Sequence, residues 1–245
     1  HNCNIKTIKI SKFYRLFDKL INKIFSMFNI NNYISRYIDL VCNEIKICNK
    51  KYDYILIENN MYLYKRVFES YNKDTKFIFH LHNDVGNRDK PIRLCKFISD
   101  TSYKVLTVSD FLNEKFKKVT GCNHVETYYN CINKKSFLSE ISGYPSRKKL
   151  NMKQNDIIFM YTGRFSKEKG LLELIFSFEN ICKKHNNVKL LVVGNNDEKN
   201  SYTKKVKKIS YKLKNKIIFA GYVDNDKLAN YYKLCDVVII PSICD

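Results

Sequence analysis

The chain has 245 residues, with 44 Lys and Arg against 24 Asp and Glu, nine Cys and no Trp. This length suits one large domain or two small ones. An apolar fraction of 44%, with 18 Tyr and 16 Phe, provides for a buried core and excludes global disorder. No 18 apolar residues run together, so the sequence predicts no membrane-spanning helix, and its composition excludes collagen-like, disulfide-framework and low-complexity classes.

The net charge of +20 comes mainly from lysine, because the chain has 37 Lys and only seven Arg. Abundant Lys, Asn and Ile are typical of an AT-rich coding sequence, which supplies positive charge without a functional demand. Arg is the preferred residue for reading bases and gripping phosphates, so its scarcity argues against a nucleic-acid partner. An anionic membrane surface or an anionic substrate suits the charge equally well.

The nine cysteines are scattered without a CxxC pair, and the five histidines show no ligand spacing near them. We therefore expect free, mostly buried thiols in a reducing cytoplasm, and no metal site. No secretory leader is visible. Because the chain begins with His1 rather than Met, we expect the gene product to start earlier.

Residues 12–28 show the clearest helical period, with apolar side chains at every third or fourth position. The other side of this helix is basic and carries Lys12, Arg15, Lys19 and Lys23. The pattern fits either a core-facing helix with a lysine-rich solvent side or a basic amphipathic helix on an anionic membrane. A second helix is expected near residues 33–49.

From residue 54 onward, short β-rich runs alternate with helical patterns. The expected strands cover residues 54–58, 77–81, 104–108 and 125–129. The expected helices between them cover residues 61–71, 91–99 and 110–119. This alternation predicts a parallel, doubly wound sheet, with Ser109 as the N-cap of the third helix.

Residues 133–152 are polar, contain Gly143 and Pro145, and are expected to form a linker. After them the alternation restarts, with strands at 157–161, 189–193, 216–219 and 236–240, and helices at 167–184, 201–214 and 225–233. The sequence therefore predicts two Rossmann-like α/β domains facing each other, over residues 1–132 and 153–245. Ligand sites on such sheets lie at the carboxyl ends of the strands.

The segment GRFSKEKG, residues 163–170, follows an expected strand and opens a helix. Gly163 permits a tight turn, and Ser166 is expected to cap the helix. Arg164 and Lys169 can converge on one anion beside the positive end of the helix. That arrangement suits a diphosphate and could neutralise a departing nucleoside diphosphate without a metal. The simpler interpretation is that both side chains only solvate a helix.

Further motifs follow in order: LLVVGNND, then IIFAGYV, then YYKLCDVVIIPS. Together with GRFSKEKG they resemble the nucleotide-sugar-binding domain of family 4 retaining glycosyltransferases, which have the GT-B fold. In the first half, YILIENN, FIFHLHNDV, YKVLTVSDFL and YYNCINKKSF are similar to the acceptor domain of the same family. The resemblance is strongest to members that build capsular, lipopolysaccharide or spore-coat glycans, and it covers roughly residues 50–245.

The resemblance implies a role for each matched residue. Arg164 and Lys169 would bind the donor diphosphate and stabilise the leaving group. His82 would lie near the reacting sugar, unless it is only a hydrogen-bonded loop histidine, whereas His80 is expected to pack. The other donor-side residues are Gly163, Gly194 and the run Gly221, Tyr222 and Val223, which would flank the base. The acceptor side would be lined by Asn83, Asp84, Ser109 and Asn130.

The chain also departs from the family pattern. Cys131 stands where a glycine usually follows Asn130. The family carries two glutamates, eight residues apart, after the Pro-Ser that is Pro241-Ser242 here, and the chain stops at Asp245 before them. The glycine-rich loop of the acceptor domain is not evident either. We therefore expect a chain truncated at both ends, and do not expect these residues to be active alone.

These observations predict a retaining, metal-independent and cofactor-free hexosyltransferase of the bacterial cell envelope. It would use a UDP or GDP sugar and a hydroxyl of a surface glycan or lipid-linked acceptor. We expect it in the cytoplasm, docked on the inner membrane leaflet through residues 12–28. The alternatives are a degenerate, non-catalytic nucleotide-sugar-binding module, a nucleotide-sugar epimerase and a nucleic-acid binder.

Overall fold

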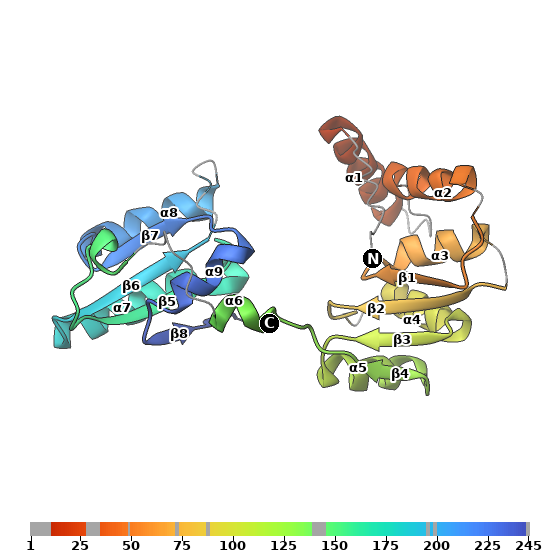
Figure 1. Cartoon of the computed structure of the whole chain (residues 1–245). Helices are drawn as coiled ribbons and strands as arrows, with labels where there is room; N and C mark the ends of the chain where they lie inside the picture. Colours follow the sequence, from red (N-terminus) through yellow and green to blue (C-terminus); the bar gives the residue numbers. More distant parts are fainter. Residues whose placement is uncertain are drawn as a thin grey trace. The chain divides into compact units, whose positions relative to one another are not determined.

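The computed structural model describes residues 11–27, 35–48, 50–71, 74–86, 89–138, 146–194, 197 and 200–243. The chain divides into two compact units, His1–Cys131 and Ile132–Asp245 (Figure 1). Each unit contains one four-stranded sheet whose strands are all parallel. The fold is therefore α/β, as predicted, and all eight expected strands are present among the described residues.

In the first unit the sheet has the strand order β1-β2-β3-β4. Its strands are β1 (Tyr54–Glu58), β2 (Lys76–Leu81), β3 (Lys104–Thr107) and β4 (Val125–Thr127). Its helices are α1 (Lys12–Met27), α2 (Arg36–Cys48), α3 (Met61–Ser70), α4 (Asp89–Thr101) and α5 (Asp110–Thr120). Ser109 is confirmed as the N-cap of α5, because its side chain accepts a hydrogen bond from the backbone N–H of Leu112.

The core of the first unit lies on one face of its sheet. Ile57, Phe79 and Val105 are in register on neighbouring strands and are buried against α2 to α5. Side chains alternate between the two faces of a strand. Glu58 and His80, the next registered pair, therefore lie on the face opposite this core.

In the second unit the strand order is β7-β6-β5-β8. Its strands are β5 (Ile157–Thr162), β6 (Val188–Val193), β7 (Ile217–Gly221) and β8 (Val237–Ile239). Its helices are α6 (Lys134–Leu138), α7 (Leu171–Lys184), α8 (Ser201–Ser210) and α9 (Asn225–Tyr232), with 3₁₀ turns at Lys148–Leu150, Lys167–Lys169 and Tyr211–Leu213. The expected linker thus contains α6, whose Phe137 ring lies 6.1 Å from the ring of Tyr232 on α9.

The order of the second sheet reverses at β5, because β6 and β7 extend to one side of β5 and β8 lies on the other. Helices cover both faces of this sheet. Tyr161 and Val192 pack with α7 and α8, whereas Met160 and Val193 pack with α9. In doubly wound sheets, ligands bind outside the carboxyl ends of the strands at such a reversal. A ligand site is therefore expected at the segments that follow β5 and β8.

Helix α1 leaves three apolar side chains of its stripe outside the core. Leu16, Leu20 and Ile24 have exposed fractions of 66%, 58% and 42%. Asp18 is buried and accepts a hydrogen bond of 2.9 Å from the backbone N–H of Arg36, which links α1 to the start of α2. The interpretation of residues 12–28 as an ordinary core-facing helix is therefore wrong for these side chains. Of the helices that the structure describes, none combines the length and the apolar character needed to span a bilayer.

The seven cysteines within the described residues are free. Cys42, Cys95 and Cys122 are buried, but Cys48 and Cys131 are exposed and the other two are half-buried. Three of these seven thiols are buried, fewer than expected, and Cys3 and Cys244 lie outside the described residues. Burial raises the pKa of the Cys95 thiol to about 12, so that thiol is unreactive at neutral pH.

Candidate functional site

Two glycine backbones meet at the carboxyl ends of β5 and β6. The N–H of Gly163 donates a hydrogen bond of 3.0 Å to the carbonyl of Val193. A Cβ atom added to Gly194 would stand 2.0 Å from the carbonyl oxygen of Gly163, which no side chain tolerates. A Cβ added to Gly163 would meet the hydroxyl of Tyr161 at 3.0 Å. The close approach of these segments therefore depends on glycine at position 194, whereas a side chain at position 163 would require a small shift of the Tyr161 hydroxyl.

Tyr161 shapes the loop that follows β5, and the sequence interpretation missed it. Its ring is buried and its hydroxyl donates a hydrogen bond of 2.8 Å to the carbonyl of Arg164. Burial raises the pKa of this hydroxyl to about 12, so it stays protonated at neutral pH and remains a donor. This bond fixes the backbone from which the Arg164 side chain projects.

The Arg164 side chain extends into solvent, with 79% of its surface exposed. Its partner is Glu168, four residues on, at a distance of 3.5 Å between Nη2 and Oε1. An exposed pair of this kind contributes little to stability. The guanidinium can therefore exchange Glu168 for an anionic ligand at small cost, and its planar fork suits a diphosphate.

The segment after Arg164 differs from the helix that was expected to begin at residue 167. Lys167–Lys169 form a 3₁₀ turn, and α7 begins only at Leu171. Ser166 has the extended backbone of a cap residue, but its side chain makes no capping hydrogen bond. Gly170, with φ of 62°, adopts the left-handed conformation that separates the turn from α7. Lys169 therefore lies in the turn before the helix and is half-buried.

The segment after β8 packs against this same turn. A Cβ atom on Gly170 would stand 1.9 Å from the carbonyl oxygen of Pro241. The N–H of Ile243 donates a hydrogen bond of 3.0 Å to the carbonyl of Glu168. The GRFSKEKG and Pro-Ser motifs, about 70 residues apart in the chain, thus come into contact at the point where the strand order reverses.

The end of β7 completes this edge of the sheet. Gly221 has φ of 75°, and its carbonyl accepts a hydrogen bond of 2.8 Å from the N–H of Gly194. Tyr222 is 72% exposed, whereas Val223 is half-buried and packs on the core between the sheet and α9. The structure thus brings all the expected donor-side residues to the segments that follow three adjacent strands.

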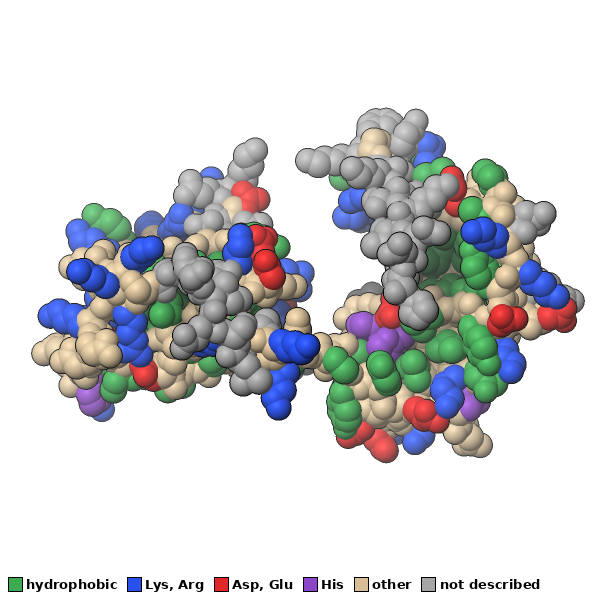
Figure 2. Space-filling view, in the orientation of Figure 1, with side chains coloured by type: hydrophobic (Ala, Val, Ile, Leu, Met, Phe, Trp, Pro, Cys, Tyr) green, Lys and Arg blue, Asp and Glu red, His purple; other side chains and the backbone are tan. Residues whose placement is uncertain are grey.

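The first unit gathers polar side chains at its own carboxyl edge. The Nε2 atom of His82 lies 2.6 Å from Oε2 of Glu58 and 3.2 Å from Nδ1 of His80. Nδ1 of His80 lies 3.1 Å from the same carboxylate oxygen. His80 is buried, as expected, but it joins this cluster rather than only packing. Figure 2 shows a patch of histidine side chains on the surface of this unit, with another histidine apart from it.

Asn59 holds the loop that carries His82. It adopts a left-handed backbone conformation with φ of 54°, which Asn tolerates better than most residues. Its Oδ1 atom accepts hydrogen bonds from the backbone N–H groups of His82, at 3.0 Å, and Asn83, at 3.1 Å. Neither Asn59 nor Glu58 was singled out in the sequence, although Glu58 is the last residue of the first expected strand and Asn59 follows it.

The other expected acceptor-side residues differ in their contacts. Asp84 pairs with Lys115 at 2.7 Å, and this hydrogen-bonded ammonium lowers the pKa of the Asp84 carboxyl. The hydroxyl of Ser109 is engaged in the cap of α5, and Asn83 and Asn130 are exposed. All four follow the carboxyl ends of β2, β3 or β4.

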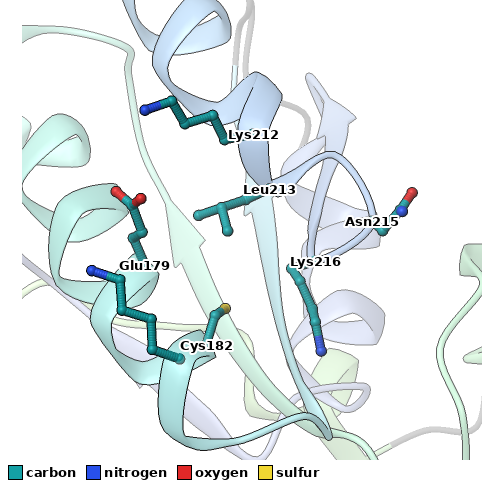
Figure 3. A pocket seen from close by; sticks show the side chains of 7 residues that line it. Glu179, Cys182, Lys212, Leu213, Asn215 and Lys216 are labelled. Atoms are coloured by element: carbon teal, nitrogen blue, oxygen red, sulfur yellow. The ribbon is translucent and has the colours of Figure 1, made fainter.

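A pocket of about 400 Å³ lies elsewhere in the second unit (Figure 3). Glu179 and Cys182 from the end of α7 face Lys212 and Leu213 from the turn after α8. Lys216, directly before β7, also lines it. This pocket is therefore at the amino ends of the strands, opposite the edge that carries the glycine turns.

The fold defines the class of this protein. HepE of Anabaena, solved in complex with UDP, matches 84% of this chain with a TM-score of 0.66 and 18% identity, over 57% of its own length. The two parallel α/β units thus have the GT-B fold, as predicted. In addition, residues 145–244, which include the whole edge from Gly163 to Pro241, match the family described as Glycosyl transferases group 1.

Two of the relatives in sequence are named as glycosyltransferases. Over 98% of its length the chain is 28% identical to lipopolysaccharide 1,2-N-acetylglucosaminetransferase of Salmonella typhimurium. It is 30% identical, over 63% of its length, to an uncharacterized glycosyltransferase of Methanocaldococcus jannaschii. The chain spans 60% of the first relative and 40% of the second. Residues 145–244 are therefore similar to group 1 glycosyltransferases.

Proposed function

We propose that this chain binds a nucleoside-diphosphate sugar at the carboxyl edge of its second sheet and acts in a retaining, metal-independent hexose transfer. The acceptor is a hydroxyl of a cell-surface glycan or of a lipid-linked precursor. One observation carries the proposal: Gly163, Arg164 and Lys169 follow β5 at the reversal of strand order, against the backbone that follows β8.

The donor diphosphate is assigned to the loop of residues 163–170. The weakly paired Arg164 guanidinium and the nearby Lys169 ammonium supply two positive charges for the phosphates. These charges also stabilise the nucleoside diphosphate as it leaves, which removes the need for a metal ion in that step. The binding of UDP by HepE supports this class of donor.

The nucleoside is assigned to the segment after β7. Gly221 leaves the backbone open for a ligand, because no atom lies within 4 Å of a Cβ added there, and Tyr222 offers an exposed aromatic ring beside it. Gly221 to Val223 then flank the base through backbone contacts. For the sugar, UDP-N-acetylglucosamine is the first donor to test, because one relative is named for the transfer of N-acetylglucosamine.

The acceptor side is assigned to the first unit. His82, held by Asn59 and Glu58, is proposed to lie near the reacting sugar, with Asn83, Asp84, Ser109 and Asn130 around the acceptor. Helix α1 is proposed to dock this unit on the anionic inner leaflet. Its exposed Leu16 and Leu20, and the basic residues between them, support that assignment.

The donor proposal is tested by calorimetric titration with UDP, UDP-glucose, UDP-N-acetylglucosamine and GDP-mannose. The double variant Arg164→Ala with Lys169→Ala is expected to weaken binding of the preferred donor at least 100-fold, because each lost charge-assisted contact is worth about 1.5–3 kcal/mol. Lys167→Ala is the matched control. Its exposed side chain lies in the same 3₁₀ turn, and the variant should bind like the wild type.

Equal binding by the double variant and the Lys167→Ala control would refute the diphosphate assignment. The non-catalytic binding module would be favoured by a different result. In that case the double variant loses binding, but the wild type releases no UDP from a UDP-sugar in the presence of acceptor lipids.

A further inference from the structure

We propose that the pocket at the amino edge of the second sheet binds the phosphate groups of a small, multiply charged compound from solution. Glu179 and Cys182 of α7 form one side of this pocket, and Lys212 and Leu213 of the turn after α8 form another (Figure 3). The inference does not rest on the proposed function, because it concerns a second site on the unit that carries the diphosphate loop.

The pocket lies apart from the diphosphate loop. Helix α7 ends at Lys184 and strand β7 begins at Ile217, and the lining residues come from just before these two points. The diphosphate loop, residues 163–170, follows the opposite ends of the strands. Strand β6 has six residues, which at about 3.3 Å per residue separates the two edges of the sheet by roughly 16 Å. A compound in the pocket is therefore bound independently of the loop.

Three lysine side chains line the pocket without a carboxylate partner. Nζ of Lys183 donates a hydrogen bond of 3.1 Å to the amide oxygen of Asn180, and Nζ of Lys216 donates to the backbone carbonyl of Asn186. Lys212 is exposed and makes no hydrogen bond or ion pair with any residue that the structure describes. Figure 3 shows its side chain extending toward α7.

This concentration of positive charge is not compensated by the fold. In the first unit, by contrast, Lys104 lies 2.6 Å from a carboxylate oxygen of Glu126, and Lys115 lies 2.7 Å from one of Asp84. The pocket has three ammonium groups against the single carboxylate of Glu179. Like charges around one hollow repel each other, and an anion between them relieves that repulsion. A phosphate group can accept hydrogen bonds from several ammoniums through its separate oxygens.

The remaining lining residues favour phosphate groups over a whole nucleotide. Burial raises the pKa of the Cys182 thiol, so the thiol stays protonated and adds no negative charge. None of the residues that line the pocket is aromatic, so they offer no ring on which a nucleoside base could stack. The volume of about 400 Å³ is in the range of small-molecule sites.

Glu179 provides a test with the opposite sign. Its side chain is half-buried in the pocket and forms no ion pair within the described part of the chain. The carboxylate repels an anion that enters, so its replacement by a neutral amide should strengthen binding. Simple damage to the fold would weaken binding instead.

The experiment is a titration of the isotope-labelled chain with inorganic pyrophosphate at low ionic strength, followed through the amide resonances of Cys182 and Lys216. Saturable shifts are expected there, and this local readout separates them from binding at residues 163–170. Lys212→Ala and Lys216→Gln should each weaken this binding about fivefold, because each removes one ammonium. Glu179→Gln should strengthen it at least about twofold. Lys204→Ala, which removes an exposed ammonium from α8, is the matched control and should bind like the wild type.

Circular dichroism checks that every variant folds. The proposal would be overturned by an absence of saturable shifts at Cys182, by equal binding of Lys212→Ala and Lys204→Ala, or by weaker binding of Glu179→Gln. Lipid headgroups carry the same phosphate chemistry. Sedimentation with phosphatidic acid vesicles that depends on Lys212 and Lys216, without any shift caused by pyrophosphate, would also overturn the proposal and assign the lysines to a membrane contact.

Discussion

Tyr161 illustrates how one buried hydroxyl controls the loop that carries Arg164. Its hydrogen bond to the Arg164 carbonyl crosses the turn at Gly163 and leaves the guanidinium to solvent. The same hydroxyl limits the space above Gly163, where a Cβ would come within 3.0 Å of it. The geometry of the proposed diphosphate loop is therefore determined by the core beneath it.

The Tyr161→Phe variant should be less stable than the wild type by about 1 kcal/mol at pH 8, because the carbonyl of Arg164 loses its donor. The folded-state pKa of about 12 exceeds the ordinary value of 10.0, so Tyr161 contributes stability below pH 10 that is lost as pH rises toward 12. At pH 11 this loss amounts to about 1.4 kcal/mol in the wild type and is absent from the variant.

Urea denaturation at pH 8 and pH 11 measures both effects, since every other titrating group is common to the two proteins. The stability difference should disappear and slightly reverse by pH 11, because the loss in the wild type exceeds the contribution of the hydrogen bond. A stability difference that stays constant between these pH values would show that burial does not raise the pKa of the Tyr161 hydroxyl.

Helix α1 exposes apolar side chains that the packing of its own unit does not cover. Its apolar side chains Leu16, Leu20 and Ile24 are exposed beside Lys19 and Lys23. Basic and apolar side chains together provide both electrostatic attraction to anionic lipids and burial at the interface.

We predict that Lys12→Glu, Arg15→Glu, Lys19→Glu and Lys23→Glu together release the protein from anionic vesicles in a sedimentation assay. Each basic residue near the surface contributes about 1 kcal/mol, so the loss should exceed 100-fold in partition coefficient. Lys204→Glu, Lys205→Glu and Lys208→Glu on the exposed side of α8 form a control with a similar reversal of charge. If the two sets reduce binding alike, only the net charge matters and α1 is not the docking element.

At this scale the sequence predicts most elements well, because apolar runs and helical periods are local properties. Every expected strand appears within three residues of its expected ends. The start of α7 was wrong by four residues, because the contact of Gly170 with Pro241 is made by a segment about 70 residues away. The exposure of α1 was not predictable either, since a helical period indicates an apolar side but not its partner.

For the whole molecule, the main consequence of the topology is that parallel strands place chemically useful residues at one edge of each sheet. The donor-side residues were predicted from glycines and basic residues directly after expected strands. The cluster of Glu58, His80 and His82 was missed because its signal depends on pairing two strands in register, although the His-x-His spacing was visible. Figure 2 also shows basic side chains spread over the visible face of the second unit, so charge alone does not locate its site.

The central claim is that the carboxyl edge of the second sheet binds the nucleotide. The most direct measurement is a titration of the isotope-labelled chain with UDP, followed through the backbone amide resonances. The largest shifts are predicted at Gly163, Gly194 and Tyr222, at the ends of β5, β6 and β7. Shifts confined to Cys182 and Lys216, at the pocket on the amino edge, would contradict the account.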